Sequence, residues 1–122
     1  DNSNTTLVKT KKANSVAVRR LKNANKLLRS NRTNEFYDET LKAVWGYMSD
    51  KMNIPVSQLS KDNVANELEK RGADSSLIAE LNSVLNEAEF ARYAPGDAGQ
   101  AMDKVYTMAI DVIGRMENSI KK

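Results

Sequence analysis

Apolar residues recur at helical spacing along most of this chain of 122 residues. From about Lys12 they follow one another at intervals of four, three and four: Ala17, Leu21, Ala24 and Leu28. That spacing places them on one face of a helix. Strict alternation of apolar and polar residues does not persist over five residues anywhere, so we predict no strands. The pattern predicts an all-α protein.

The second predicted helix, from about Asn34 to Met52, has the widest apolar face. Acidic residues stand in its first turns, where they complement the helix dipole: Glu35, Asp38 and Glu39. Its inner positions are Tyr37, Leu41, Val44, Trp45, Met48 and Met52, widened by Phe36, Ala43 and Tyr47. We therefore expect this helix to be buried on more than one side.

Three further helices are predicted after a single turn at residues 56–59: residues 61–71, 75–93 and 99–119. The second helix should end before Pro55, because the residue before a proline disfavours helical backbone angles. Ser60 and Asp74 are expected N-caps, and Gly72 is an expected left-handed residue after the third helix. Ala94 to Asp97 form the clearest loop in the chain.

The elements predict one helical domain, residues 12–122, folded as an irregular bundle of about five helices. Residues 1–11 are polar and lack periodicity, so we expect a disordered polar and basic leader. The first two helices should form an antiparallel pair with the small Ala24 facing Phe36 and Tyr37. Such a pair is typical of a tetratricopeptide (TPR) hairpin and equally of an ordinary helical hairpin. No second copy of the pair follows, so a repeat array is not expected.

The composition argues against an enzyme. The chain has no cysteine and no histidine, which excludes disulfides, thiolate metal sites and imidazole bases. Glu87 and Glu89 are two residues apart and do not share a helix face, and Asp103 and Asp111 are eight apart. The loop at residues 95–99 lacks the glycine spacing of nucleotide-binding loops. We therefore predict no catalytic residues, no cofactor and no metal site.

Charge is distributed unevenly along the chain. Residues 1–32 carry nine basic residues and one acidic residue. The remaining ninety residues carry ten basic and fifteen acidic residues. The net charge of the whole chain is +3. Four of the basic residues recur at intervals of three, four and three: Arg19, Lys22, Lys26 and Arg29. This spacing predicts one basic helix face opposite the apolar stripe.

The basic face has several interpretations. It could meet an acidic protein, the anionic lipid next to a membrane span, or nucleic-acid phosphates, or it could be a solvated face without a partner. Aromatic residues for base stacking do not interleave with it, and the region does not form a helix-turn-helix. Nucleic acid is therefore the alternative partner rather than the expected one.

Two motifs carry a family resemblance, LKAVWGYMSDKMNIP at residues 41–55 and EFARYAPGD at residues 89–97. They resemble the C-terminal cytoplasmic domain of the BatD family, single-span membrane proteins of the bacterial aerotolerance (Bat) operon. In that family a helix of the type LkALWGYLSDKLNIP precedes a helix that ends in C/A-E-F-A-R-Y-A-P-G-D. The similarity extends from about Lys11 to Ile113. Ala88 stands where the family often has cysteine, which tells against a redox role.

The motif residues expected to be mainly structural are Trp45, Tyr47, Pro55, Phe90, Arg92, Tyr93 and Pro95. The aromatic residues lie on helical stripes, and core packing is their default role. The Tyr93 hydroxyl is expected to fix the loop at residues 94–97. Arg92 is expected to pair with Glu89 or Asp97, or else to offer its planar guanidinium to a carboxylate of a partner.

The resemblance implies a place and a set of partners. It places the domain at the cytoplasmic face of the inner membrane, with a transmembrane helix of the parent protein before Asp1. It implies von Willebrand factor A-type proteins, a TPR protein and a MoxR-type AAA+ ATPase as partners. Our hypothesis is a non-catalytic docking domain for such partners. The alternative hypothesis is a basic helical nucleic-acid-binding domain.

Overall fold

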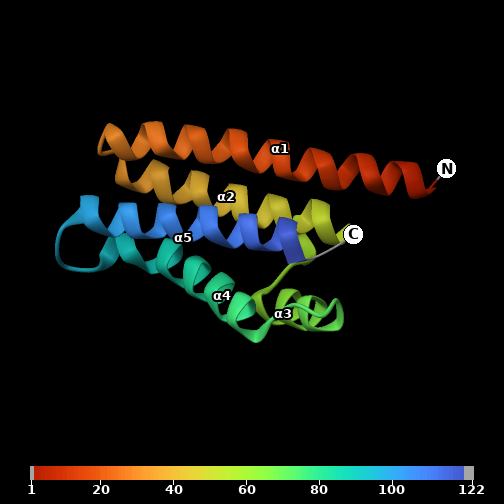
Figure 1. Ribbon diagram of the computed structural model, residues 1–122. Helices are drawn as coiled ribbons and strands as arrows, with labels where there is room; N and C mark the ends of the chain where they lie inside the picture. Colours follow the sequence, from red (N-terminus) through yellow and green to blue (C-terminus); the bar gives the residue numbers. More distant parts are fainter. Residues whose placement is uncertain (1, 120–122) are drawn as a thin grey trace.

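A computed structural model shows an all-helical chain (Figure 1). It describes the backbone of residues 2–119 and the side chains of residues 14–119. The α-helices are α1 (Asn2–Arg29), α2 (Thr33–Met52), α3 (Lys61–Lys70), α4 (Ser75–Phe90) and α5 (Ala98–Ser119). Two short 3-10 helices join them, η1 (Val56–Gln58) and η2 (Ala91–Tyr93). Residues 2–119 contain no strand, so the predicted all-α bundle is confirmed.

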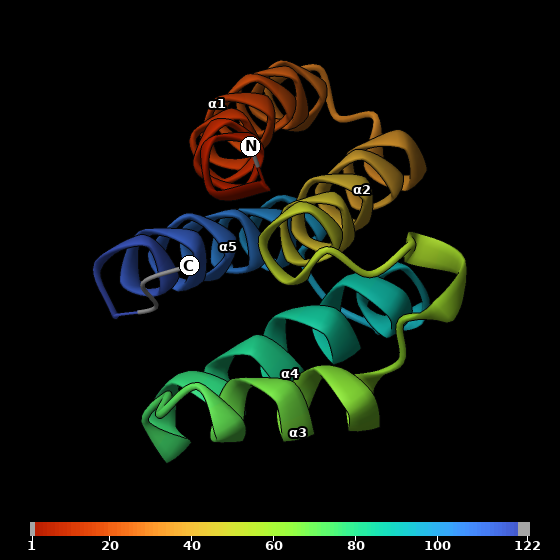
Figure 2. The same ribbon diagram turned by 90° about the vertical axis from the view of Figure 1, so that its right-hand side faces the viewer.

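The helices pack in three layers (Figures 1 and 2). α1 and α2 form an antiparallel hairpin, and α5 packs against both of them. α4 lies on the other side of α2 and α5, and α3 contacts α4. Seen from the end in Figure 2, α1 covers one side of the α2–α5 layer, and α3 and α4 cover the opposite side. One outer surface of the molecule is therefore formed by α1.

Two clusters of buried side chains fill the interior. The larger draws on all the α-helices, and the smaller holds Ala24 of α1 against the aromatic pair of α2. Phe36 and Tyr37 meet edge to face, with ring centroids 5.0 Å apart. Leu41 and Tyr106 pack against both clusters. The predicted contact of Ala24 with Phe36 and Tyr37 is confirmed, and α2 is buried on more than one side, as expected.

The turn and cap residues agree with the sequence patterns. Asn53, which ends α2, is left-handed at φ 57°, and Gly72 after α3 is left-handed at φ 82°. The Ser60 hydroxyl accepts the backbone N–H of Asn63, whose side chain in turn accepts the N–H of Ser60. This reciprocal pair is a capping box. The Asp74 carboxylate accepts the N–H of Ser76 at the start of α4.

Two helix boundaries differ from the predicted ones. α1 begins at Asn2 rather than near Lys12, because residues 2–11 contain no proline or glycine that would stop the backbone of the helix. Their side chains lie outside the described part of the chain, and a disordered leader at residues 1–11 stays a prediction. α4 ends at Phe90, and the chain continues to Tyr93 as a 3-10 turn. Ala94 must be extended before Pro95, and the last turn tightens as the helix ends.

Candidate functional site

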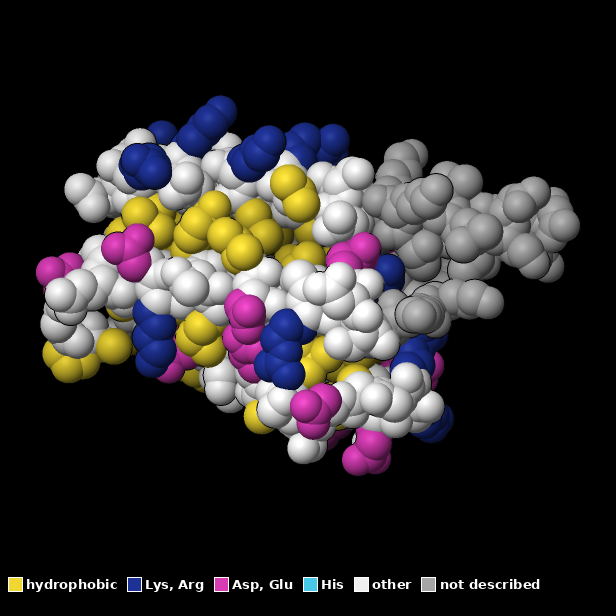
Figure 3. Space-filling model, viewed as in Figure 1, with side chains coloured by type: hydrophobic (Ala, Val, Ile, Leu, Met, Phe, Trp, Pro, Cys, Tyr) yellow, Lys and Arg dark blue, Asp and Glu magenta, His cyan; other side chains and the backbone are white. Residues whose placement is uncertain are grey.

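The candidate site is the outer surface of α1. We call its side chains Arg19, Lys22, Lys26 and Arg29 the α1 basic face, and all four are exposed. Ala17, Leu21 and Ala24 on the opposite side of the helix are buried, as the spacing predicts. Figure 3 shows Lys and Arg side chains standing in a row along the outer edge of α1. That these four residues contact a partner or lipid remains a prediction.

The α1 basic face is not neutralised by the domain itself. Among the described residues, no acidic side chain forms an ion pair with any of its four members. Most other basic side chains do pair: Arg32–Glu35, Lys51–Glu117, Lys61–Glu89, Arg71–Glu67, Arg92–Asp38, Lys104–Glu87 and Arg115–Glu80. The positive charge of this face is therefore available to a molecule outside the domain.

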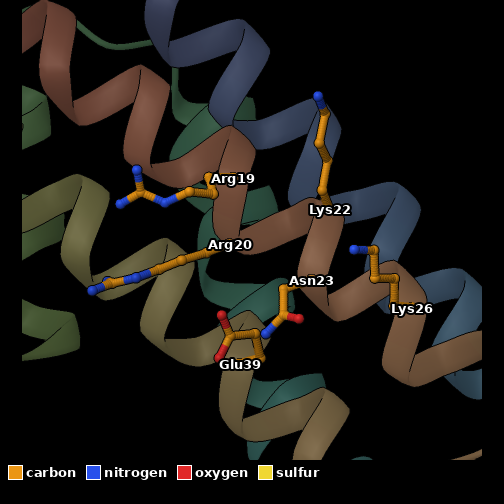
Figure 4. Close-up of a pocket in the computed structure, with 6 residues that line it drawn as sticks. All are labelled: Arg19, Arg20, Lys22, Asn23, Lys26 and Glu39. Carbon is orange, nitrogen blue, oxygen red and sulfur yellow. The ribbon is translucent and has the colours of Figure 1, made fainter.

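Part of the face borders a depression of about 500 Å³ between α1 and α2 (Figure 4). Its lining residues are Arg19, Arg20, Lys22, Asn23, Lys26 and Glu39. In Figure 4 the side chains of Asn23 and Glu39 turn toward each other, whereas Lys22 extends away from them. Ammonium and guanidinium groups arranged in this way attract carboxylates or phosphates. The mostly charged lining is unlike that of small-molecule pockets, which are predominantly apolar.

A smaller, apolar depression of about 220 Å³ lies beside the first. Its lining residues are Arg20, Leu41, Lys42, Trp45, Gly46 and Val56. Arg20 lines both depressions, and its Nη1 donates a hydrogen bond to the Lys42 carbonyl at 3.0 Å. Gly46 leaves room for that guanidinium, since a Cβ there would lie 2.6 Å from Arg20 Nη1.

Arg20 is not among the residues predicted from the sequence, although a signal for it is present. It lies three residues after Ala17 and four before Ala24, at the border between the apolar stripe and the polar surface of α1. Its Nη1 therefore reaches the α2 backbone, unlike the exposed members of the α1 basic face. Trp45 is expected in the core, and it is half-buried, packing on the larger cluster while lining the apolar depression.

The second motif differs most from its predicted structure. Phe90 and Tyr93 are expected to pack structurally, and their side chains are instead 63% and 78% exposed. Ala91 follows the buried Ala88 by three residues and packs on the smaller cluster, whereas Phe90 follows Ala88 by two residues and lies on the opposite side of α4. The Tyr93 hydroxyl is expected to fix the loop at residues 94–97, but among the described residues it forms no hydrogen bond with that loop, and most of its side chain is in solvent.

Arg92 does hold the corner between α4 and α5, with a different partner from those expected. Its Nη2 lies 3.1 Å from Asp38 Oδ1 of α2, and its guanidinium carbon lies 5.9 Å from the centroid of the Tyr37 ring. The expected partners have other contacts. Glu89 pairs with Lys61 at 2.7 Å, and Asp97 accepts a backbone N–H at the start of α5.

A buried polar cluster joins the C-terminal part of α2 to α5. The Tyr47 hydroxyl donates a hydrogen bond to the Glu117 carboxylate, and Lys51 Nζ lies 2.8 Å from the same oxygen. Burial, followed by the hydrogen bond and charge of Glu117, raises the pKa of Tyr47 well above its ordinary value. The core role predicted for Tyr47 is therefore confirmed.

Other kinds of site find no support in the described part of the chain. The described side chains include no group of three or more His, Cys, Asp or Glu residues that could hold a metal ion. Within residues 2–119, no helix has the length and apolar character needed to cross a membrane. No protein-family model, curated protein or solved structure matches this chain. The resemblance to the BatD family therefore stays a prediction.

Proposed function

We propose that this chain is a non-catalytic docking domain whose α1 basic face binds an acidic surface of a partner protein. The observation that supports this most is the contrast between unpaired and paired cations. The four exposed side chains of α1 have no ion pair among the described residues, whereas most basic side chains of α2 to α5 do. A concentration of one charge on one helix speeds the encounter with a complementary surface and orients it.

A protein partner is favoured over nucleic acid by the surroundings of the face. The described surface of α1 presents no aromatic side chain on which bases could stack. The adjacent depression is lined by Arg20 and Lys42 together with apolar side chains and one indole, and its apolar part suits a protein better than a phosphate backbone. Protein interfaces combine such apolar regions with a charged rim.

The BatD resemblance supplies the proposed partners. They are the von Willebrand factor A-type, TPR and MoxR-type AAA+ proteins of the Bat operon, met at the cytoplasmic face of the inner membrane. An anionic membrane surface is a second proposed contact for the same cations. In this proposal the domain recruits and orients other proteins and performs no chemistry of its own.

Lysine-reactive cross-linking tests the proposal. The chain of residues 1–122 is incubated with a lysate of the source organism, with and without nuclease, and cross-linked peptides are identified by mass spectrometry. We expect links from Lys22 and Lys26 to one of the proposed partners. Links from Lys70 and Lys104, on α3 and α5, should be rarer and provide the internal control.

Other results would contradict the proposal. Capture that disappears after nuclease treatment would support the nucleic-acid alternative. Binding to vesicles of anionic lipid, with no protein cross-linked through α1, would assign the face to the membrane. Links confined to Lys70 and Lys104 would place the docking surface elsewhere on the domain.

A further inference from the structure

The apolar depression beside the α1 basic face is lined by residues from three helices of the fold. Arg20 comes from α1, Val56 from η1, and the other lining residues, Leu41, Lys42, Trp45 and Gly46, from α2. Leu41 and Trp45 are half-buried and rest on the core, so the base of the depression is held by packing. Val56 is 52% exposed and forms an apolar part of its wall.

The size of the depression suits one side chain. Its volume of about 220 Å³ is below the roughly 300–1,000 Å³ of pockets that enclose small-molecule ligands. Interfaces between proteins commonly place one apolar side chain of the partner in such a hollow, with polar contacts around it. We therefore consider a side chain of a bound segment rather than a free metabolite.

The charges around the depression define the rest of that segment. Arg20 and Lys42 line it, and Arg20 also lines the basic depression that contains Lys22 and Lys26. The apolar and basic surfaces are therefore continuous across the α1–α2 hairpin. Glu39 is the acidic residue in the lining of the basic depression. A segment that crosses this surface would place its charged residues near several cations.

We infer that the occupant is an acidic peptide segment of the partner protein that carries one apolar side chain. The apolar side chain enters the depression and contacts the Trp45 indole, and the flanking carboxylates meet Arg20 and the α1 basic face. This inference rests on the proposed docking function and names the chemistry of the partner. It also gives a role to the half-buried Trp45.

Trp45 provides the measurement, because it is the one tryptophan of the chain. The probes are short synthetic peptides of Asp and Glu with one central Leu, and matched peptides with a central Ser. The Leu peptides should shift the Trp45 emission and bind at least about ten-fold more tightly than the Ser peptides, since only they bury an apolar group. Higher salt should weaken the binding of both kinds of peptide.

Two variants separate the depression from the basic face. Val56→Ser removes apolar surface from the depression and should reduce the preference for Leu to less than about three-fold. Ile110→Ser is the matched control, because Ile110 on α5 is also an exposed aliphatic residue, at 45%, and does not line the depression. This control should keep the full preference.

Several outcomes would overturn the inference. Equal affinity for the Leu and Ser peptides would show that the depression receives no side chain. The docking function would still stand in that case if Lys22→Glu abolished the binding of both kinds of peptide. A Leu preference that survives in Val56→Ser would place the apolar contact elsewhere. Failure of every acidic peptide to bind would reject an acidic segment as the occupant, while the cross-linking experiment would decide separately on the docking function.

Discussion

Ala24 illustrates how one small residue sets the packing of two helices. It is fully buried where α1 meets Phe36 and Tyr37 of α2. A side chain larger than alanine at this position has to displace one of these rings or separate the helices. The helical spacing of α1 was sufficient to predict its burial.

Ala24→Leu should therefore destabilise the domain by about 1–3 kcal/mol, because overpacking forces neighbouring side chains out of their preferred rotamers. The free energy of unfolding, from urea denaturation followed by circular dichroism, measures the effect. Ala79→Leu is the matched control, since Ala79 is exposed on α4, and it should change stability by less than about 0.5 kcal/mol. Equal effects at the two positions would show that α1 and α2 do not meet closely at Ala24.

Tyr47 should make stability depend on pH in the alkaline range. Its pKa is raised in the folded protein, first by burial and then by Glu117. Above about pH 10 the unfolded chain releases the tyrosine proton while the folded chain keeps it. The unfolded state is then favoured, and stability falls as pH rises.

Tyr47→Phe removes this titrating group. The stability advantage of the wild type over Tyr47→Phe, measured by urea denaturation, should therefore shrink as pH rises from about 9 to about 11. A difference that stays constant over this range would mean that Tyr47 is not buried against Glu117.

At the second motif, helical spacing could predict the direction of one aromatic side chain but not of the other. Phe90 follows the buried Ala88 by two residues, so the α-helical spacing of α4 points its side chain away from the core. The change to a 3-10 turn at Ala91 alters the direction of Tyr93, because the two kinds of helix differ in residues per turn. Helical periodicity contains no signal for this change.

At the scale of elements, turn chemistry predicted most helix ends. Ser60, Asp74 and Gly72 are placed as expected because caps depend on local sequence. Partners across the fold were not predictable in this way. Arg92 pairs with Asp38 of α2 rather than with an acid of its own motif, and sequence spacing does not reveal which helices lie side by side.

Two glycines test this account of the elements with the same substitution. Gly72 has φ 82° in open space, so Gly72→Ala should cost about 1 kcal/mol through backbone strain alone. Gly114 lies within α5 and has open space where the methyl group of alanine would stand, so Gly114→Ala should stabilise by about 0.5–1 kcal/mol through higher helix propensity. Thermal unfolding of the two variants should therefore shift in opposite directions. Shifts in the same direction would contradict the assigned backbone geometry.

At the scale of the whole molecule, the sequence indicated the number of helices and the charge asymmetry. It did not indicate that α1 forms an outer layer with α2 and α5 beneath it, because several arrangements bury the same apolar stripes. The exposure of the α1 basic face followed from spacing. The apolar depression could not be predicted from spacing, since it requires Arg20, Trp45 and Val56 to come together from separate elements.

The central claim is that a partner protein docks on α1 through charge. The most direct measurement compares the amount of partner captured by the wild type and by two charge-swapped variants. Lys22→Glu with Lys26→Glu reverses charge on the α1 basic face, and Lys70→Glu with Lys104→Glu makes the same change in net charge on α3 and α5. We predict that the first variant loses at least about ten-fold in capture, while the second stays within about two-fold of the wild type. Equal losses in both variants, or no loss in the first, would contradict docking through α1.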